Sequence, residues 1–402
     1  MKITRDAFLS FSIYGLGLLA ILVADIYVSS TFANDKIAEW AFVKSTILIV
    51  GTLCLLGYDQ VFVRDPKLIR GVWKNFLLQS LAISAGVSFL IMLFKEYPLE
   101  KAILLFLSIL AFSLLSYLSS ASRANFKLWQ AQFSINFWKV ALLAVLVLIP
   151  STEIVLLFAT TIGCTAIISL FLKGYKPSGG FNGPSIENKN ARKLGMAFVF
   201  TNLTLILAIY GEQFLINLHG DVITSAHLFH YFSVYTPIAL SINGFLGFYF
   251  APKIRRAGTV TVSQFKTISG KFLIFSSCIT LISVMFGTLY FIWIKAYSLD
   301  TIDYVLVFFL ATICLTRGVY TAGSVCLGVF GTAKQLQKAS IFCIGITIIY
   351  TILISIVLKT TSGIQAAQMI SACSLLNWLL RLVIFNYFTY QALNNAHDGA
   401  RS

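Results

Sequence analysis

Charged residues are scarce in this sequence of 402 residues, where Asp, Glu, Lys and Arg together make up 11% of the chain. Water-soluble domains usually carry about 25% charged residues. Apolar residues make up 58%, so the lipid bilayer must be the solvent for most of the chain. The apolar runs are continuous over about 20 residues and lack the alternating segments that a transmembrane barrel requires. Because only helices and closed barrels span bilayers, the sequence predicts an all-α polytopic membrane protein.

Three further absences narrow the function. The chain has no Gly-x-x-x-x-Gly-Lys-Ser/Thr motif, because the nearest stretch, 328–334, has the wrong spacing. No polar connection exceeds about 20 residues, which leaves no room for an ATPase or a sugar-nucleotide-binding domain. The seven cysteines lie within apolar runs without a Cys-x-x-Cys pair, so we interpret them as small core residues. We therefore expect no cofactor, no metal and no enzymatic activity.

Basic residues outnumber acidic ones, 30 to 15, and give a formal charge of +15. They form short clusters between the apolar runs rather than one basic domain, so no nucleic-acid partner is expected. If the N-terminus is cytoplasmic, the basic segments 64–74, 173–193 and 253–271 all face the cytoplasm. The positive-inside rule therefore predicts a multi-pass membrane protein with both termini cytoplasmic.

Hydropathy predicts about twelve transmembrane helices. The first apolar run follows Lys2 and Arg5 and lacks a small-residue cleavage site, so we interpret it as an uncleaved span. The expected spans lie near 8–30, 38–57, 73–94, 100–122, 128–149, 153–172, 195–217, 225–250, 271–294, 304–329, 337–358 and 364–388.

A polar, Gly- and Pro-containing connection divides these spans into two sets of six. It predicts an N-terminal six-helix bundle over 1–175, a cytoplasmic linker over 176–193 and a C-terminal six-helix bundle over 194–402. The halves also share a weak repeat. Asp25 and Glu212 lie near the outer end of the first helix of each half. Two parallel repeats of this kind suit a transporter with its site between them.

Ionisable residues inside apolar spans are the main functional candidates, because a charge in the bilayer costs at least about 2.5 kcal/mol. The cations are Lys139, Arg317 and Arg381, and the acids are Asp25 and Glu212. Helical spacing places several of these on polar stripes. The stripes are Gln132, Asn136 and Lys139; Ser113, Ser116, Ser120 and Arg123; Arg317, Tyr320 and Ser324; and Ser374, Asn377 and Arg381.

Each of these residues has two interpretations. The cations can line a positively charged cavity that attracts anions, and the planar fork of arginine suits phosphate oxygens. Alternatively, Ser and Asn bond neighbouring helices, while Arg123 and Arg381 extend to the inner interface. Asp25 and Glu212 can bind a coupling H⁺ or Na⁺, or can pair with a nearby base and fix helix packing. His227, which shares a helix face with two tyrosines, is interpreted as polar packing or an interfacial aromatic belt rather than a metal ligand.

Four short motifs resemble one family of transporters, the oligosaccharide and O-antigen flippases of the multidrug/oligosaccharidyl-lipid/polysaccharide (MOP) exporter superfamily. The segment 57–64 is similar to the family's Gly-x-Asp-Gln-x-x-x-Arg. The segment 210–216 resembles its seventh helix with an acidic residue, and Pro252 stands at the end of the eighth. The segment 363–367 fits its Gly-x-x-Ala-Ala pattern. One departure is Glu212-Gln213, where family members often have Asp-Arg.

The resemblance implies two six-helix lobes around a central cavity with alternating access. The implied substrate is an undecaprenyl-pyrophosphate-linked oligosaccharide, flipped to the outer leaflet for O-antigen, capsule or exopolysaccharide synthesis. Besides membrane lipids, a polysaccharide polymerase and a chain-length regulator are candidate partners. The expected substrate-binding cations are Arg317, Lys139, Arg381, Arg123 and Arg64, and the expected ion-coupling residues are Asp25 and Glu212.

Two other functions remain as alternatives. A multidrug or cation antiporter of the same superfamily should carry acids deep in its cavity, which the basic excess opposes. A membrane-embedded polysaccharide polymerase or glycosyltransferase would usually carry a long outer loop with catalytic residues. The sequence contains no such loop.

Overall fold

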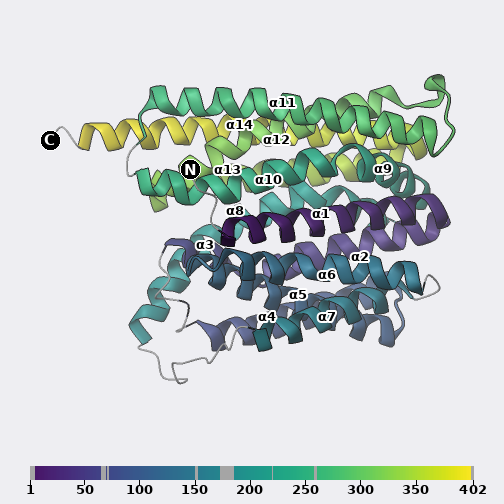
Figure 1. Cartoon of the computed structure of the whole chain (residues 1–402), viewed down its shortest axis with the longest axis horizontal. Helices are drawn as coiled ribbons and strands as arrows, with labels where there is room; N and C mark the ends of the chain where they lie inside the picture. The colour runs from purple at the N-terminus through teal and green to yellow at the C-terminus, as the bar shows by residue number, and fades with distance from the viewer. Residues whose placement is uncertain are drawn as a thin grey trace. The chain divides into compact units, whose positions relative to one another are not determined.

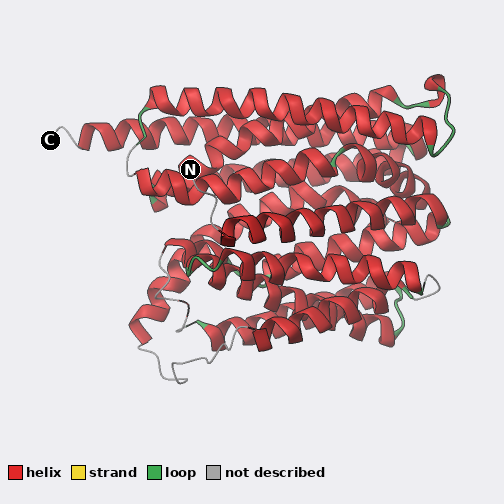
Figure 2. Ribbon diagram, viewed as in Figure 1, coloured by secondary structure: helices red, strands yellow, loops and turns green. Residues whose placement is uncertain are grey.

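In the computed structural model, every regular element among the described residues is helical (Figure 2). The structure describes residues 5–64, 69, 72–149, 153–172, 185–219, 221–257 and 260–399. The helices are labelled in Figure 1. They are α1 (Arg5–Thr31), α2 (Asn34–Leu53), α3 (Tyr58–Arg64), α4 (Trp73–Lys95), α5 (Leu99–Ala124), α6 (Leu128–Leu148), α7 (Ile154–Leu172), α8 (Ser185–His219), α9 (Val222–Tyr235), α10 (Pro237–Ala257), α11 (Val262–Trp293), the 3₁₀ turn η2 (Leu299–Thr301), α12 (Tyr304–Phe330), α13 (Ala333–Thr360) and α14 (Gly363–Gly399).

Nine helices in the described part of the chain are long and apolar enough to cross a membrane. This confirms the predicted all-α polytopic class. The three other expected spans correspond to α2, to α8, and to α9 together with α10. α2 carries several charged residues near its start, and α8 is polar towards both ends, which lowers their apolar character.

The expected span 225–250 is not one helix. α9 ends at Tyr235, and α10 begins at Pro237 after the capping residue Thr236. Proline has no backbone N–H and is tolerated in the first turn of a helix, where that donor would be unsatisfied. Pro237 therefore permits a new helix to start where the previous one ends.

The chain forms two compact units. Unit 1 comprises Met1–Val28 and Glu39–Phe214, and unit 2 comprises Ser29–Ala38 and Leu215–Ser402. In the range expected to be a linker, 185–193 is the first part of α8, while 176–184 lies outside the described residues.

Aromatic packing holds α3, α4 and α5 together in unit 1. Tyr117 contacts Phe62 and Phe76, with ring centroids 5.2 Å and 4.4 Å apart. Its hydroxyl donates a hydrogen bond to the carbonyl of Ile69 over 2.9 Å. All these side chains belong to one buried cluster, so the short α3 is fixed against α4 and α5.

Gly57 makes the turn between α2 and α3 possible. Its φ of +77° lies in the left-handed region, which favours glycine. A Cβ atom at this position would collide with the carbonyl oxygen of Gly195 and lie 2.9 Å from the Cβ of Phe198. The glycine that opens the Gly-x-Asp-Gln motif therefore also allows α8 to approach this turn.

Unit 2 is built around α12, with a buried polar link between α10, α11 and α12. Ser276 donates to the Oδ1 of Asn243 over 3.0 Å, and Asn243 donates to the carbonyl of Cys314 over 3.2 Å. These groups satisfy one another in an apolar interior, as buried polar groups must. A Cβ at Gly318 would overlap Ser276, with the two Cβ atoms 2.5 Å apart, so the link requires glycine there.

The direction of α12 across the membrane can be tested by labelling. We predict that, in a variant without the seven native cysteines, Asp300→Cys reacts with an impermeant maleimide in intact cells. Lys334→Cys should react only after permeabilisation, because both positions are exposed and lie at opposite ends of α12. The reverse pattern would place both termini outside and invert the topology.

Candidate functional site

The first polar cluster lies in unit 1, between α1 and α2. Asp25 is 4% exposed and accepts a hydrogen bond from the indole N–H of Trp40 over 2.9 Å. Its other oxygen forms an ion pair with Lys44, 19 residues further along the chain. Asp25 therefore has the basic partner that the packing interpretation requires, while its part in ion coupling stays a prediction.

The second element of this cluster is Lys139 on α6. The predicted stripe forms a chain of side chains: Lys139 donates to the Oδ1 of Asn136 over 2.7 Å, and Asn136 donates to the Oε1 of Gln132 over 2.6 Å. Lys139 also lies within electrostatic range of Asp25 and Lys44. Unit 1 thus holds one carboxylate and two ammonium groups close together inside apolar helices.

We predict that Lys44→Met destabilises the protein by about 3 kcal/mol, because removal of one partner leaves the buried Asp25 carboxylate without its ion pair. Asp25→Asn in addition should restore part of this loss. Thermal unfolding of both variants in detergent measures the difference. If the double variant is less stable than Lys44→Met, the ion pair is not the main way in which Asp25 and Lys44 stabilise the fold.

Arg381 is the centre of the polar cluster in unit 2. Its side chain is completely buried on α14. The Nε atom donates to the Oδ1 of Asn377 over 3.0 Å, and one terminal nitrogen donates to the Oγ1 of Thr347 on α13 over 2.7 Å. Both acceptors are neutral. In the structure Arg381 therefore does not extend to an interface, contrary to the snorkelling interpretation.

Arg317 lies on α12 against the same helix, α14. Its guanidinium carbon is 4.8 Å from the ring centroid of Trp378, within cation–π range. Trp378 also contacts Tyr320, with ring centroids 5.5 Å apart. Tyr320 is within electrostatic range of both Arg317 and Arg381. The structure thus brings these two predicted cations to one part of unit 2.

Arg123, in the last turn of α5, has an acidic neighbour. It interacts electrostatically with Asp59, the acid of the Gly-x-Asp-Gln motif. Asp59 also accepts a hydrogen bond from Asn202 on α8 over 2.9 Å. Arg123 and Asp59 therefore connect α3, α5 and α8 within unit 1. The side chain of Arg64, the motif's arginine, lies outside the described residues.

Glu212, the second predicted ion-coupling residue, is 5% exposed on α8. It is as deeply buried as Asp25, while its part in ion coupling stays a prediction. Sequence reasoning missed several partners of the predicted residues. These are Trp40 and Lys44 beside Asp25, Thr347 beside Arg381, and Trp378 beside Arg317.

Ion pairs also join the helix ends of unit 1 that are predicted to face outward. The Lys101 ammonium lies 2.6 Å from Glu39 and 3.0 Å from Glu153, so it links the starts of α2, α5 and α7. Burial, together with the negative charge of Glu39, raises the pKa of the adjacent Tyr97 to about 12. These residues fix one end of unit 1 and hold no isolated charge for a substrate.

Comparison with known proteins identifies the fold. No protein-family model and no curated protein matches the sequence. Solved structures do match over nearly the whole chain. An inward-facing multidrug resistance MATE family transporter of the MOP superfamily is 15% identical, with a TM-score of 0.61, covering 97% of this chain and 99% of its own.

Two further structures give the same result. A MATE protein in the straight conformation is 14% identical, with a TM-score of 0.58, covering 98% of this chain and 96% of its own. A MOP superfamily transporter from Pyrococcus furiosus, described as having a binding pocket of reverse polarity that suggests a different function, is 12% identical. Its TM-score is 0.50, and the match covers 98% of this chain and 95% of its own. The chain therefore has the fold of MOP superfamily transporters.

Proposed function

We propose that this protein flips undecaprenyl-pyrophosphate-linked oligosaccharide from the inner to the outer leaflet of the cell inner membrane by alternating access. The observation that carries the proposal is the presence of fixed cations on apolar helices in both units. Lys139 lies in unit 1, and Arg317 and Arg381 lie in unit 2. The fold of MOP superfamily transporters supports a transport function.

The electrostatic argument concerns the pyrophosphate. A multiply charged head group loses its hydration when it enters a medium of low dielectric constant, and this loss must be compensated by protein charges. Arginine offers two parallel N–H donors to phosphate oxygens, whereas lysine acts as a point charge. The half-buried Arg317, held against Trp378, is the group that we assign to the head group, with Lys139 and Arg381 contributing positive potential.

Ion coupling and topology complete the proposal. Asp25 and Glu212 are buried carboxylates at matching positions of the two halves, which suits residues that gain and lose a proton or Na⁺. Both termini are cytoplasmic. The flipped oligosaccharide would then be available to a polysaccharide polymerase and a chain-length regulator on the outer side.

A multidrug or cation antiporter is the second candidate. Two of the similar structures belong to MATE proteins, one described as a multidrug resistance transporter, and Asp25 offers a buried carboxylate. The transporter described with a binding pocket of reverse polarity supports the view that pocket charge varies within this fold. We favour the anionic substrate because Lys139, Arg317 and Arg381, which are half-buried or buried within their helices, outnumber the buried acids Asp25 and Glu212.

Binding by the purified protein in nanodiscs separates the two candidates. We expect undecaprenyl-pyrophosphate-linked oligosaccharide to bind at least tenfold more tightly than uncharged undecaprenol, a difference of about 1.4 kcal/mol. A cationic dye should bind no better to nanodiscs with protein than to empty ones. Tight dye binding without a preference for the pyrophosphate lipid would favour the antiporter.

A further inference from the structure

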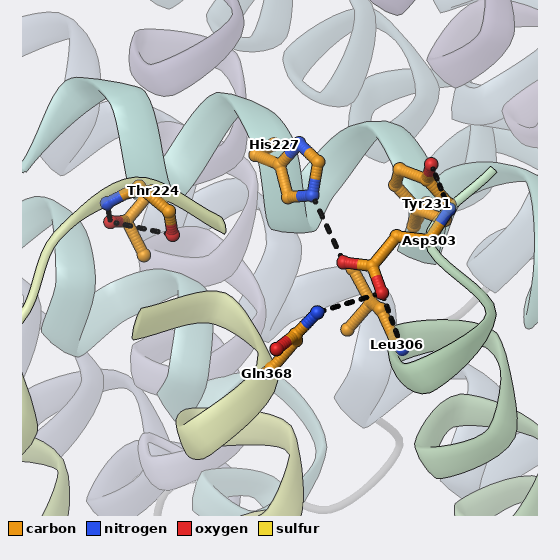
Figure 3. Close-up of polar contacts among 7 residues, drawn as sticks. Thr224, His227, Tyr231, Asp303, Leu306 and Gln368 are labelled. Carbon is orange, nitrogen blue, oxygen red and sulfur yellow. Dashed lines mark hydrogen bonds and ion pairs between the residues drawn. The ribbon is translucent and has the colours of Figure 1, made fainter. Parts of the chain in front are cut away.

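A histidine and an aspartate face one another at the end of unit 2 where α9, α12 and α14 begin (Figure 3). His227 lies in the second turn of α9, and Asp303 immediately precedes α12. The Nε2 atom of His227 is 3.6 Å from the Oδ2 atom of Asp303. Their side chains are 22% and 9% exposed, so part of the imidazole ring is open to solvent, while the two facing atoms, Nε2 and Oδ2, are both buried.

The rest of Asp303 is firmly held. Its Oδ1 atom accepts hydrogen bonds from the backbone N–H of Leu306 over 3.0 Å and from Gln368 on α14 over 2.9 Å. Its backbone N–H donates to the hydroxyl of Tyr231 over 2.9 Å. Asp303 thus caps α12 and ties it to α9 and α14, and the carboxylate cannot turn away from His227 without loss of these bonds.

The two atoms that face each other, unlike the Oδ1 atom and the backbone N–H of Asp303, are not held by hydrogen bonds. Neither the Nε2 atom of His227 nor the Oδ2 atom of Asp303 has a hydrogen-bond partner among the described residues. Their separation is too long for a normal hydrogen bond, which brings the two atoms to about 2.7–3.2 Å. One carboxylate oxygen is therefore left without a donor beside an imidazole nitrogen that can take up a proton.

We propose that His227 and Asp303 form a site that binds one proton during the transport cycle. The proposal rests on the proposed ion-coupled transport and adds a site besides Asp25 and Glu212. The proton moves from a hydronium ion to Nε2 of the neutral imidazole, which becomes an imidazolium, and water is released. The new N–H then donates to Oδ2 of Asp303, which draws α9 towards the start of α12. Loss of the proton to water reverses the step.

The surrounding charges favour His227 over its neighbour His230 as the proton acceptor. His230 lies 2.5 Å from the hydroxyl of Ser29 and within electrostatic range of Lys295. The positive charge of Lys295 disfavours a positive charge on the His230 ring. Burial lowers the pKa of Lys295, which lies in the loop after α11.

Among the residues that the structure describes, the other neighbours of the His227–Asp303 pair named by its contacts carry no positive charge. α14 presents the neutral Gln368 to Asp303, α11 presents the ring of Phe291 to His230 and Tyr231, and Tyr231 and Tyr297 are phenols. Two further acids lie at this end of unit 2: Asp221 caps the start of α9 through Thr224, and the exposed Asp300 lies in η2. Asp303 is therefore the carboxylate that faces His227.

Histidine NMR on the substrate-free protein tests the site. The chain has only four histidines, and His227→Gln identifies the signal of His227 in ¹⁵N-histidine-labelled protein in nanodiscs. We expect His227 to titrate between pH 5 and 8. In Asp303→Asn the midpoint of the His227 titration should fall by about one pH unit, because the negative charge that favours the protonated ring is lost. Asparagine is a good N-cap, so α12 should keep its start.

Asp221→Asn is the matched control, since it also removes the charge of a capping aspartate at this end of unit 2. It should leave the His227 midpoint unchanged. A His227 signal that does not titrate between pH 5 and 8, or one that Asp303→Asn leaves unaltered, overturns the proposal. Because no substrate is present, failure here is distinct from failure to bind the pyrophosphate lipid.

Discussion

Replacement of Arg317 by alanine is expected to lower export of the lipid-linked oligosaccharide at least tenfold, while the amount of folded protein in the membrane stays normal. The half-buried guanidinium supplies the paired donors for the phosphate, and its contact with Trp378 contributes only about 1 kcal/mol to the fold. Lipid-linked repeat units should accumulate on the inner leaflet. Surface polysaccharide and the lipid-linked pool of a complemented deletion strain measure both effects.

Two further variants make the result specific. Arg317→Lys should rescue export in part, because it keeps the charge and loses the planar fork. Lys334→Ala removes the same charge from an exposed position at the start of α13 and should export normally. Full polysaccharide from the Arg317→Ala strain would remove this residue from the mechanism.

Gly318→Ala is expected to cost about 2–3 kcal/mol of stability and to lower the yield of folded protein. The added methyl group would overlap Ser276 and lie 3.0 Å from the Nδ2 atom of Asn243. α12 would have to move away from α11 and break the buried hydrogen bonds between them. Thermal unfolding in detergent measures the loss.

Gly345→Ala provides the matched control. Gly345 lies within α13 of the same unit, and a Cβ there would meet no atom within 4 Å. Alanine should therefore leave stability unchanged or raise it by up to about 1 kcal/mol, as expected from helix propensity. Equal stabilities for the two variants would mean that α12 and α11 pack less closely than described.

The sequence predicts what depends on local spacing. Residues at i, i+4 and i+7 share a helix face, and Gln132, Asn136 and Lys139 do form one hydrogen-bonded chain on α6. Composition likewise predicts the helical, membrane-spanning class, because the solvent dictates it. The functional roles of the predicted site residues remain predictions.

Partners on other helices could not be derived from spacing. The pairing of Asp25 with Lys44 and the stacking of Arg317 on Trp378 depend on tertiary packing. Pro237 is a local indication of the break between α9 and α10. Hydropathy nevertheless predicts one continuous span over 225–250, because the window as a whole is apolar. The contact between His227 and Asp303 joins segments for which the sequence gives no common pattern.

Reconstitution into liposomes tests the central claim most directly. A fluorescent undecaprenyl-pyrophosphate-linked oligosaccharide is placed in one leaflet, and its arrival in the other is followed with an impermeant quencher. A cationic dye is followed in parallel under a proton gradient. We predict protein-dependent movement of the pyrophosphate lipid, slowed at least tenfold by Arg317→Ala, and no movement of the dye. Gradient-driven movement of the dye without movement of the lipid would contradict the account and identify the protein as a cation antiporter.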